Sequence, residues 1–169
     1  MKEKILITRK LLKENEEKLK EIFDVKLNIN DEIYTADKIL ELSKDFDGIL
    51  CAVTDQFNKE LINKLSPSIK IIANYAVGYG NIDINAAKEK NIVVTNTPEV
   101  LDDSTADVSI LLLLGASRKV LEARRAAERQ DWKWSADFML GKQMSNKRLG
   151  ILGMGRICLL YTSPSPRDA

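Results

Sequence analysis

The chain has 169 residues, with 26 Lys and Arg against 25 Asp and Glu, so its formal net charge is +1. This balance argues against a protein held to nucleic acid or to a membrane surface by bulk charge. The longest mostly apolar stretch, 108–116, is too short to span a bilayer, and no signal-peptide pattern is present, so we expect a cytoplasmic protein. The absence of histidine and the presence of two cysteines exclude a Ser-His-Asp triad, a histidine-based metal site and a four-cysteine metal site.

The first hundred residues alternate apolar runs typical of strands with patterns typical of helices. The predicted strands are 5–7, 25–29, 49–53, 69–73 and 92–94. Helical spacing of apolar residues occurs around 12–23, 39–46 and 57–65. Strands separated by helices need crossover connections, which produce a parallel sheet covered on both faces. The pattern therefore predicts an α/β fold, a flavodoxin-like doubly wound parallel sheet.

A boundary is predicted near 96–98, followed by a long helix. Residues 102–104, with Asp107 three positions after Ser104, indicate a helix start with a capping carboxylate, and the helix runs to about residue 128. Five consecutive large aliphatic residues at 110–114 mean that no single neighbour can cover the helix. We therefore expect a homodimer through helix 104–128. Glutamates interrupt the basic residues of its second half, which we interpret as a solvated face and not as a nucleic-acid site.

A partial nucleotide fingerprint follows at the end of the chain. A predicted strand at 148–152 leads into Gly153-Met154-Gly155-Arg156-Ile157. A strand followed by Gly-x-Gly is the opening of a dinucleotide-binding turn, in which the second glycine lets a pyrophosphate approach the backbone. The third small residue is missing, because Cys158 stands in its place and the following residues include two prolines.

The last twelve residues resemble a translated piece of sequencing DNA more than a segment of a natural protein. Residues 158–168 read as the translation, in one frame, of a commonly used transposase-type sequencing adapter. We therefore interpret 158–169 as a non-native tail and exclude it from fold reasoning. On this interpretation the native record ends at Ile157 and the fingerprint is truncated.

Larger blocks of the sequence carry a family resemblance. The chain resembles the D-isomer-specific 2-hydroxyacid dehydrogenases, closest to their glyoxylate/hydroxypyruvate reductase branch. The matching blocks, at the family's spacing, are 74–83, 94–101, 105–107, Trp132 and 149–157. The resemblance implies a substrate-binding domain at 1–98 and the start of an NAD(P)-binding Rossmann domain at 99–157.

The resemblance also implies roles for single residues of the first domain. The backbone N–H groups of Val77 and Gly78 would hold the substrate carboxylate, and Val53 would form an apolar wall of the same pocket. Consecutive amides in a turn after a parallel strand can form an anion-binding concavity, which agrees with this role. The alternative is that Gly78 and Gly80 merely allow a turn.

The nucleotide-binding roles fall in the second domain. The resemblance places Thr105 near the nicotinamide, although it could equally be an ordinary first-turn helix residue. Gly153, Gly155, Arg156 and Ile157 would form the pyrophosphate turn of an NAD or NADP site.

The implied activity is hydride transfer between NAD(P)H and the α-carbon of a small 2-oxo acid, which yields the D-2-hydroxy acid. The family's catalytic histidine, its carboxylate partner and its arginine are not present here, so no catalytic residue is assigned and we expect this chain to be inactive. Two alternatives remain open for the parent protein. One is a non-catalytic dinucleotide-sensing or dimer-scaffold relative, as among dehydrogenase-like co-repressors. The other is a phosphoglycerate or formate dehydrogenase relative.

Overall fold

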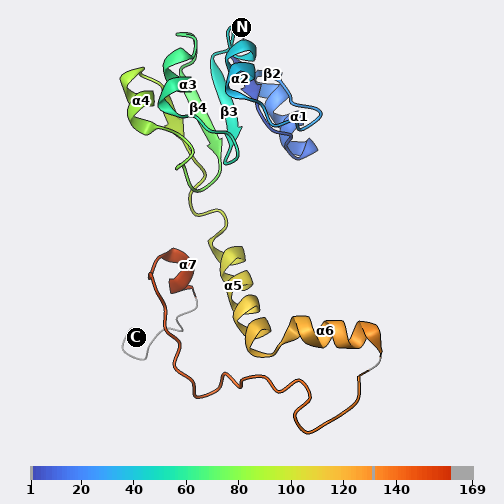
Figure 1. The fold of residues 1–169 in the computed structure, drawn as a ribbon. Coiled ribbons are helices and arrows are strands. Elements are labelled where there is room, and N and C mark those ends of the chain that lie inside the picture. The colour runs from blue at the N-terminus through green and yellow to red at the C-terminus, as the bar shows by residue number, and fades with distance from the viewer. Residues whose placement is uncertain (1, 131, 161–169) are drawn as a thin grey trace. The chain divides into compact units, whose positions relative to one another are not determined.

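The computed structural model describes residues 2–130 and 132–160 (Figure 1). The chain divides into two compact units, Met1–Val100 and Leu101–Ala169. The domain boundary predicted from the sequence follows residue 98. Residues 161–169 of the predicted tail lie outside the described residues.

The first unit is built on a parallel five-stranded sheet. Its strands are β1 (Lys4–Ile7), β2 (Asp24–Lys26), β3 (Gly48–Ala52), β4 (Ile71–Tyr75) and β5 (Val93–Thr95). Their order is β2-β1-β3-β4-β5, and every neighbouring pair is parallel. This order confirms the predicted doubly wound α/β fold.

Four short helices connect the strands of this sheet. They are α1 (Lys13–Ile22), α2 (Ala36–Leu42), α3 (Lys59–Lys64) and α4 (Ile84–Glu89). The last three begin at a side-chain cap, since Thr35, Asn58 and Asp83 accept hydrogen bonds from the N–H groups of Lys38, Leu61 and Ala86. Helices of six or seven residues are marginal by themselves, so caps and packing must hold them. The sequence analysis did not predict α4.

Phe57 corrects the predicted start of the third helix. The apolar pattern predicts a helix from Phe57, but α3 begins at Lys59 because Asn58 caps it. Phe57 is instead fully buried before the helix. Its N–H donates to the Asn81 carbonyl at 2.8 Å, and its carbonyl accepts from the Asp83 N–H at 2.9 Å. This pairing joins the β3–α3 connection to the β4–α4 connection.

The two faces of the sheet are covered differently. Successive side chains of a strand point to opposite faces of a sheet. On one face, Leu6, Ile49 and Ile72 pack with buried residues of α2, α3 and α4 in one continuous core. On the opposite face, a groove of about 330 Å³ is lined by Leu19 of α1 and Phe23 at its C-cap, together with Leu50 and Ala73. The first unit therefore buries one sheet face fully and the other only in part.

The second unit differs from the long helix that the sequence predicts. Two helices, α5 (Asp102–Ser117) and α6 (Val120–Arg129), replace the single helix 104–128. Between them Lys119 adopts a left-handed backbone with φ 54°. In a continuous helix, the Ser117 carbonyl would accept a hydrogen bond from an N–H group of the next turn. It accepts one from the Lys142 N–H instead, at 2.7 Å. The segment around residue 142 therefore ends α5.

The cap predicted from Ser104 and the Asp107 carboxylate is also not formed, because no side chain caps α5. Helix α5 begins two residues earlier, at Asp102, with Leu101 at its N-cap. The Ser104 hydroxyl lies inside the first turn and donates to the Leu101 carbonyl at 3.1 Å. Asp102 and Asp103 supply the negative charge that favours a helix N-terminus.

The strand predicted at 148–152 is not formed. Every strand in the described part of the chain belongs to the sheet of the first unit. A strand is held by hydrogen bonds to its neighbours, and the second unit offers this apolar segment no partner strand. The following helix α7 (Arg156–Leu159) contacts α5 and includes Cys158 and Leu159, the first two residues of the predicted tail. Among residues 2–130 and 132–160, no helix is long and apolar enough to cross a membrane.

Candidate functional site

The candidate site lies at the carboxyl edge of the parallel sheet, in the loop that follows β4. Ligands of open α/β sheets bind at this edge, where the loops after neighbouring strands converge. The register pairs Ala52 with Tyr75 at the ends of β3 and β4. Val53 and the loop beginning at Ala76 therefore leave the sheet from adjacent strands. The Val53 side chain is exposed, as a ligand-facing wall requires.

Three successive carbonyls of the β4 loop accept hydrogen bonds. The Ala76 carbonyl accepts from the Thr97 N–H at 2.9 Å. The Val77 carbonyl accepts from the Asn96 side-chain amide, and the Gly78 carbonyl from that of Asn74, both at 2.8 Å. In the part of the chain that the structure describes, the N–H groups of Val77 and Gly78 donate no hydrogen bond.

Neither glycine of this loop is required by the backbone conformation. The φ angles of Gly78 and Gly80 lie outside the left-handed region, where glycine is favoured. A Cβ atom built at either position would meet no atom within 4 Å. Turn geometry and packing therefore do not explain these glycines, and the space beside the loop is open to a ligand.

A buried polar network supports the loop from beneath. Asn81 donates to the carbonyls of Asp55 at 2.9 Å and Ala52 at 3.2 Å. The Asp55 carboxylate accepts from the Thr8 hydroxyl at 2.7 Å and from the Ala52 N–H at 2.9 Å. Hydrogen-bonded polar groups of this kind fix a core arrangement because an unpaired buried group is costly.

Cys51 belongs to the same network. Its thiol donates to the Asn74 side-chain oxygen, with sulfur and oxygen 3.6 Å apart. Burial raises the pKa of Cys51 to about 12, which keeps the thiol protonated at neutral pH. The polar network was not predicted from the sequence. The sequence does contain a sign of this network, because Thr8 and Asn74 are polar residues at or near the carboxyl ends of otherwise apolar strands.

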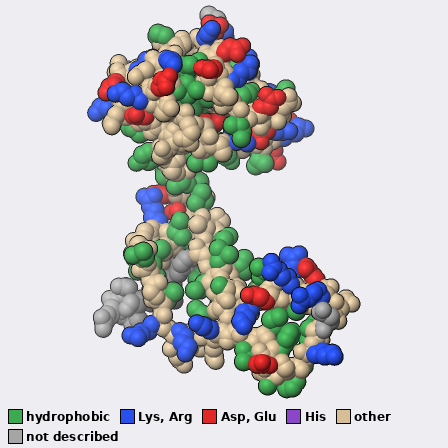
Figure 2. Space-filling view, in the orientation of Figure 1, with side chains coloured by type: hydrophobic (Ala, Val, Ile, Leu, Met, Phe, Trp, Pro, Cys, Tyr) green, Lys and Arg blue, Asp and Glu red, His purple; other side chains and the backbone are tan. Residues whose placement is uncertain are grey.

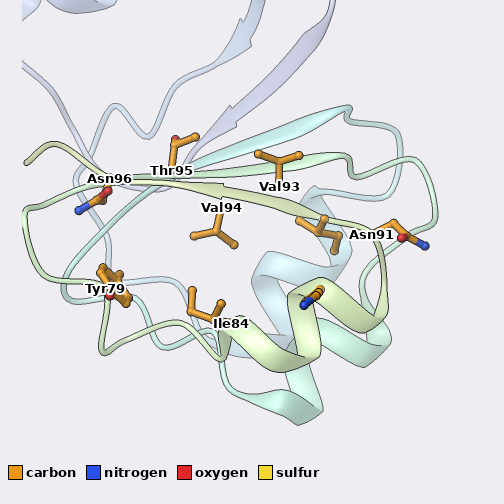
Figure 3. Close-up of a pocket in the computed structure, with 9 residues that line it drawn as sticks. Tyr79, Ile84, Asn91, Val93, Val94, Thr95 and Asn96 are labelled. Carbon is orange, nitrogen blue, oxygen red and sulfur yellow. The ribbon is translucent and has the colours of Figure 1, made fainter.

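A groove of about 600 Å³ adjoins the loop, between α4 and the edge strand β5. Figure 3 shows Tyr79 and Asn96 at one end of this groove and Asn91 at the other. Ile84 and Val94 lie between them and make its middle apolar. The groove was not predicted from the sequence.

The residues predicted to bind the nucleotide lie in the second unit. Gly153 has φ 87°, a conformation that glycine tolerates readily, and Gly155 is the N-cap of α7 with open space beside it. Arg156 and Ile157 form the start of α7, and Thr105 lies in α5, where its N–H donates to the Leu101 carbonyl. The turn conformation thus fits a dinucleotide phosphate site. The strand that should precede the turn is absent from the described second unit, so no complete nucleotide site is assembled there. Among the residues with described positions, no cluster of side chains could hold a metal ion.

Comparisons with known proteins extend over nearly the whole chain. The family model for the catalytic domain of D-isomer-specific 2-hydroxyacid dehydrogenases matches residues 5–162. A glyoxylate reductase of Thermococcus litoralis is 38% identical over 162 residues, which cover 93% of this chain and 49% of that protein. The chain therefore spans about half the length of the curated relatives it matches.

Two solved structures have the same fold. A putative D-isomer-specific 2-hydroxyacid dehydrogenase from a Polaromonas species superposes with a TM-score of 0.85 at 34% identity, covering 94% of this chain and 50% of that one. An NADPH-dependent glyoxylate/hydroxypyruvate reductase of Sinorhizobium meliloti, in complex with NADP and malonate, gives a TM-score of 0.77 at 31% identity, with coverage of 94% and 48%. With the parallel sheet, the loop after β4 and the family match in agreement, this chain belongs to the D-isomer-specific 2-hydroxyacid dehydrogenase family.

Proposed function

We propose that the protein to which this chain belongs is an NAD(P)-dependent oxidoreductase. It reduces a small 2-oxo acid of the glyoxylate or hydroxypyruvate type to the D-2-hydroxy acid. The observation that carries the proposal is the pair of N–H groups at Val77 and Gly78 at the carboxyl edge of the sheet, which donate no hydrogen bond to any described residue. Glyoxylate reductases among the relatives support the substrate class.

In this proposal the first unit binds and orients the acid. The N–H groups of Val77 and Gly78 hold its carboxylate, because successive backbone amides at such an edge attract an anion. Val53, exposed at the end of the adjacent strand, packs against the apolar part of the substrate. Binding at two points restricts how the oxo carbon can turn relative to a hydride donor.

The second unit contributes part of the nucleotide site. Gly153, Gly155, Arg156 and Ile157 hold the pyrophosphate of NAD or NADP, and Thr105 lies toward the nicotinamide. When bound, the cofactor supplies the hydride. The sequence has no histidine, so the proton donor that the family resemblance implies must come from outside these 169 residues.

The test compares the 169-residue chain with the protein translated from the complete reading frame. We expect the complete protein to oxidise NADH or NADPH with glyoxylate or hydroxypyruvate, and the 169-residue chain to stay at the buffer rate. Loss of a positioned general acid alone costs about 10²–10⁴-fold in rate. A complete protein that binds the nucleotide without oxidising it would favour the non-catalytic scaffold. Reduction of NAD+ or NADP+ by 3-phosphoglycerate or by formate, with no turnover of glyoxylate or hydroxypyruvate, would favour the phosphoglycerate or formate dehydrogenase relatives.

We also propose that the protein is a homodimer whose interface includes α5. Val108, Leu111 and Leu112 each expose more than half of their side-chain surface. Figure 2 shows hydrophobic side chains at the surface of this part of the chain. In a two-fold symmetric dimer, this apolar patch of one subunit would pack against the same patch of the other.

A further inference from the structure

We infer that Asn96 is a positioning residue for the substrate carboxylate, because its side-chain amide holds the Val77 carbonyl. Asn74 acts in the same way on the next carbonyl, that of Gly78. The two side-chain amides orient the peptide planes of the β4 loop so that its N–H groups face outward. The inference rests on the proposed function and deepens it. It also adds the Tyr79 N–H to the two groups already assigned to the carboxylate.

The geometry of the peptide bond connects each carbonyl to the next residue's N–H. A peptide unit is planar and trans, so the carbonyl of one residue and the N–H of the following residue point in opposite directions. Fixing the Ala76 carbonyl therefore fixes the Val77 N–H. Fixing the Val77 carbonyl in the same way sets the direction of the Gly78 N–H bond. Fixing the Gly78 carbonyl sets the direction of the Tyr79 N–H bond.

Each of these carbonyls has its own donor from a different position. The Thr97 N–H holds the Ala76 carbonyl at 2.9 Å. The Asn96 amide nitrogen is 2.8 Å from the Val77 carbonyl, and the Asn74 amide nitrogen is 2.8 Å from that of Gly78. Two of the three donors come from consecutive residues just after β5, so this segment determines the direction of the Val77 and Gly78 N–H groups.

The opposite side of the same peptides is free for a ligand. Across residues 2–130 and 132–160, the N–H groups of Val77, Gly78 and Tyr79 donate no hydrogen bond. In this inference these three successive N–H groups, which point away from tied carbonyls, are the donor set for an anion. A carboxylate has two oxygens and can accept from all three groups.

The buried neighbours determine which end of the Asn74 amide faces the loop. The Cys51 thiol donates to the Asn74 oxygen at 3.6 Å, which turns the nitrogen toward the Gly78 carbonyl and toward the Asn81 oxygen at 3.2 Å. Asn81 is held in turn by the Asp55 carbonyl at 2.9 Å. Asn74 is 2% exposed and part of the core, whereas Asn96 is half-buried. Asn96 is therefore the position at which the role can be tested without removing a core side chain.

The experiment titrates the 169-residue chain with oxamate, a stable carboxylate with an adjacent carbonyl, at constant ionic strength. The readout is the backbone amide spectrum by NMR. The chain is compared with the variants Asn96→Ala and Asn85→Ala. Asn85 is the matched control, because it is exposed on α4 and its side chain makes no hydrogen bond in the described residues. Backbone order parameters of all three proteins are measured without oxamate.

We expect oxamate to shift the amides of Val77, Gly78 and Tyr79 in the unaltered chain. Asn96→Ala should weaken the apparent affinity by about three- to tenfold, the effect of losing one neutral hydrogen bond, and Asn85→Ala should leave it unchanged. The order parameters of residues 77–79 should fall from about 0.85 toward 0.6 in Asn96→Ala, while the rest of the first unit keeps its values.

Three outcomes would count against this reading in different ways. Equal oxamate affinity in Asn96→Ala and in the unaltered chain would overturn the positioning role. Loosening spread over the whole first unit would overturn it too, because Asn96 would then be a general stabiliser. Absence of oxamate binding in the unaltered chain, with loosening still confined to 77–79, would overturn the carboxylate site of the proposed function but support control of the loop by Asn96.

Discussion

At the scale of single residues, Asp31 and Arg9 form a two-point ion pair beside the carboxyl edge of the sheet. Arg9 donates from Nε and Nη2 to the two Asp31 oxygens at 2.8 and 2.9 Å, and the Lys10 N–H adds a third bond at 2.9 Å. A further Arg9 nitrogen donates to the Thr54 hydroxyl at 2.7 Å. The pair thereby joins the loops that follow β1, β2 and β3. The Arg9 hydrogen bond, followed by that from Lys10, holds the pKa of Asp31 well below its ordinary value of 3.8.

This depressed pKa has a defined consequence for stability. A carboxylate with a lower pKa in the folded state stabilises the fold above its unfolded pKa, and the stabilisation is lost as pH falls toward the folded pKa. Asp31→Asn keeps the backbone, because Asp31 has φ 53° and asparagine tolerates that region. We expect the variant to be less stable than the unaltered chain at pH 7, with the difference shrinking below about pH 4.

Urea unfolding followed from pH 7 to pH 3 measures this difference. The control is Asp45→Asn, which changes an exposed carboxylate that forms no ion pair or hydrogen bond in the described structure. Its effect on the unfolding midpoint gives the baseline with which the Asp31→Asn difference is compared. If the difference in stability between Asp31→Asn and the unaltered chain stayed constant from pH 7 to pH 3, the charge of Asp31 would contribute nothing to the stability of the fold.

At the scale of elements, the start of β3 depends on a glycine. A Cβ atom at Gly48 would lie 2.7 Å from Ile71 Cγ2 on β4 and 3.0 Å from Ile5 Cδ1 on β1. Gly48 pairs in register with both residues, so β3 cannot move away from one without approaching the other. We expect Gly48→Ala to lower the free energy of unfolding by about 1–3 kcal/mol, the usual cost of overpacking.

A double-mutant cycle tests the cause. Ile71→Ala removes the nearer methyl group, so the cost of Gly48→Ala should be smaller in that background. Gly80→Ala serves as the control, because no atom lies within 4 Å of its added methyl group. Equal destabilisation by Gly48→Ala in both backgrounds, measured by urea unfolding, would exclude the Ile71 contact as its source.

The elements also show how far the sequence could predict this structure. The strands were predictable because apolar runs such as 49–53 are bounded by turn residues and charged helices. The break between α5 and α6 was not, because it depends on Lys142, distant in sequence, donating to the Ser117 carbonyl. The strand expected at 148–152 failed for a related reason, since an apolar pattern cannot supply the partner strand it needs.

The same distinction holds for the candidate site. Val77 and Gly78 were predicted because the resemblance covers them and because a glycine-containing turn after a parallel strand is typical of anion sites. Asn74 and Asn96 lie in the same matching blocks, but the sequence cannot say which carbonyl a side-chain amide reaches. That information comes from the path of the loop after β4, which brings the Val77 carbonyl to the Asn96 side-chain amide.

At the scale of the whole molecule, the exposed apolar side chains of α5 are the basis of the proposed dimer. Leu111 and Leu112 are 67% and 66% exposed, and Val108 and Leu114 are also exposed. Burying one such side chain fully contributes roughly 1.5–3 kcal/mol. Several buried together are comparable with the stability of a small domain, about 5–15 kcal/mol. Contiguous apolar surface of this kind favours association.

We therefore expect the 169-residue chain to self-associate at micromolar concentration and the double variant Leu111→Ser, Leu112→Ser to become monomeric. The matched control is Ile29→Ser with Ile33→Ser, which removes two aliphatic side chains of similar exposure, 74% and 70%, from the β2–α2 connection. Because these lie away from α5 in the sequence, the control should associate as the unaltered chain does. Light scattering and sedimentation velocity measure the mass. A monomeric unaltered chain, or a control as monomeric as the α5 variant, would mean that this helix is not the interface.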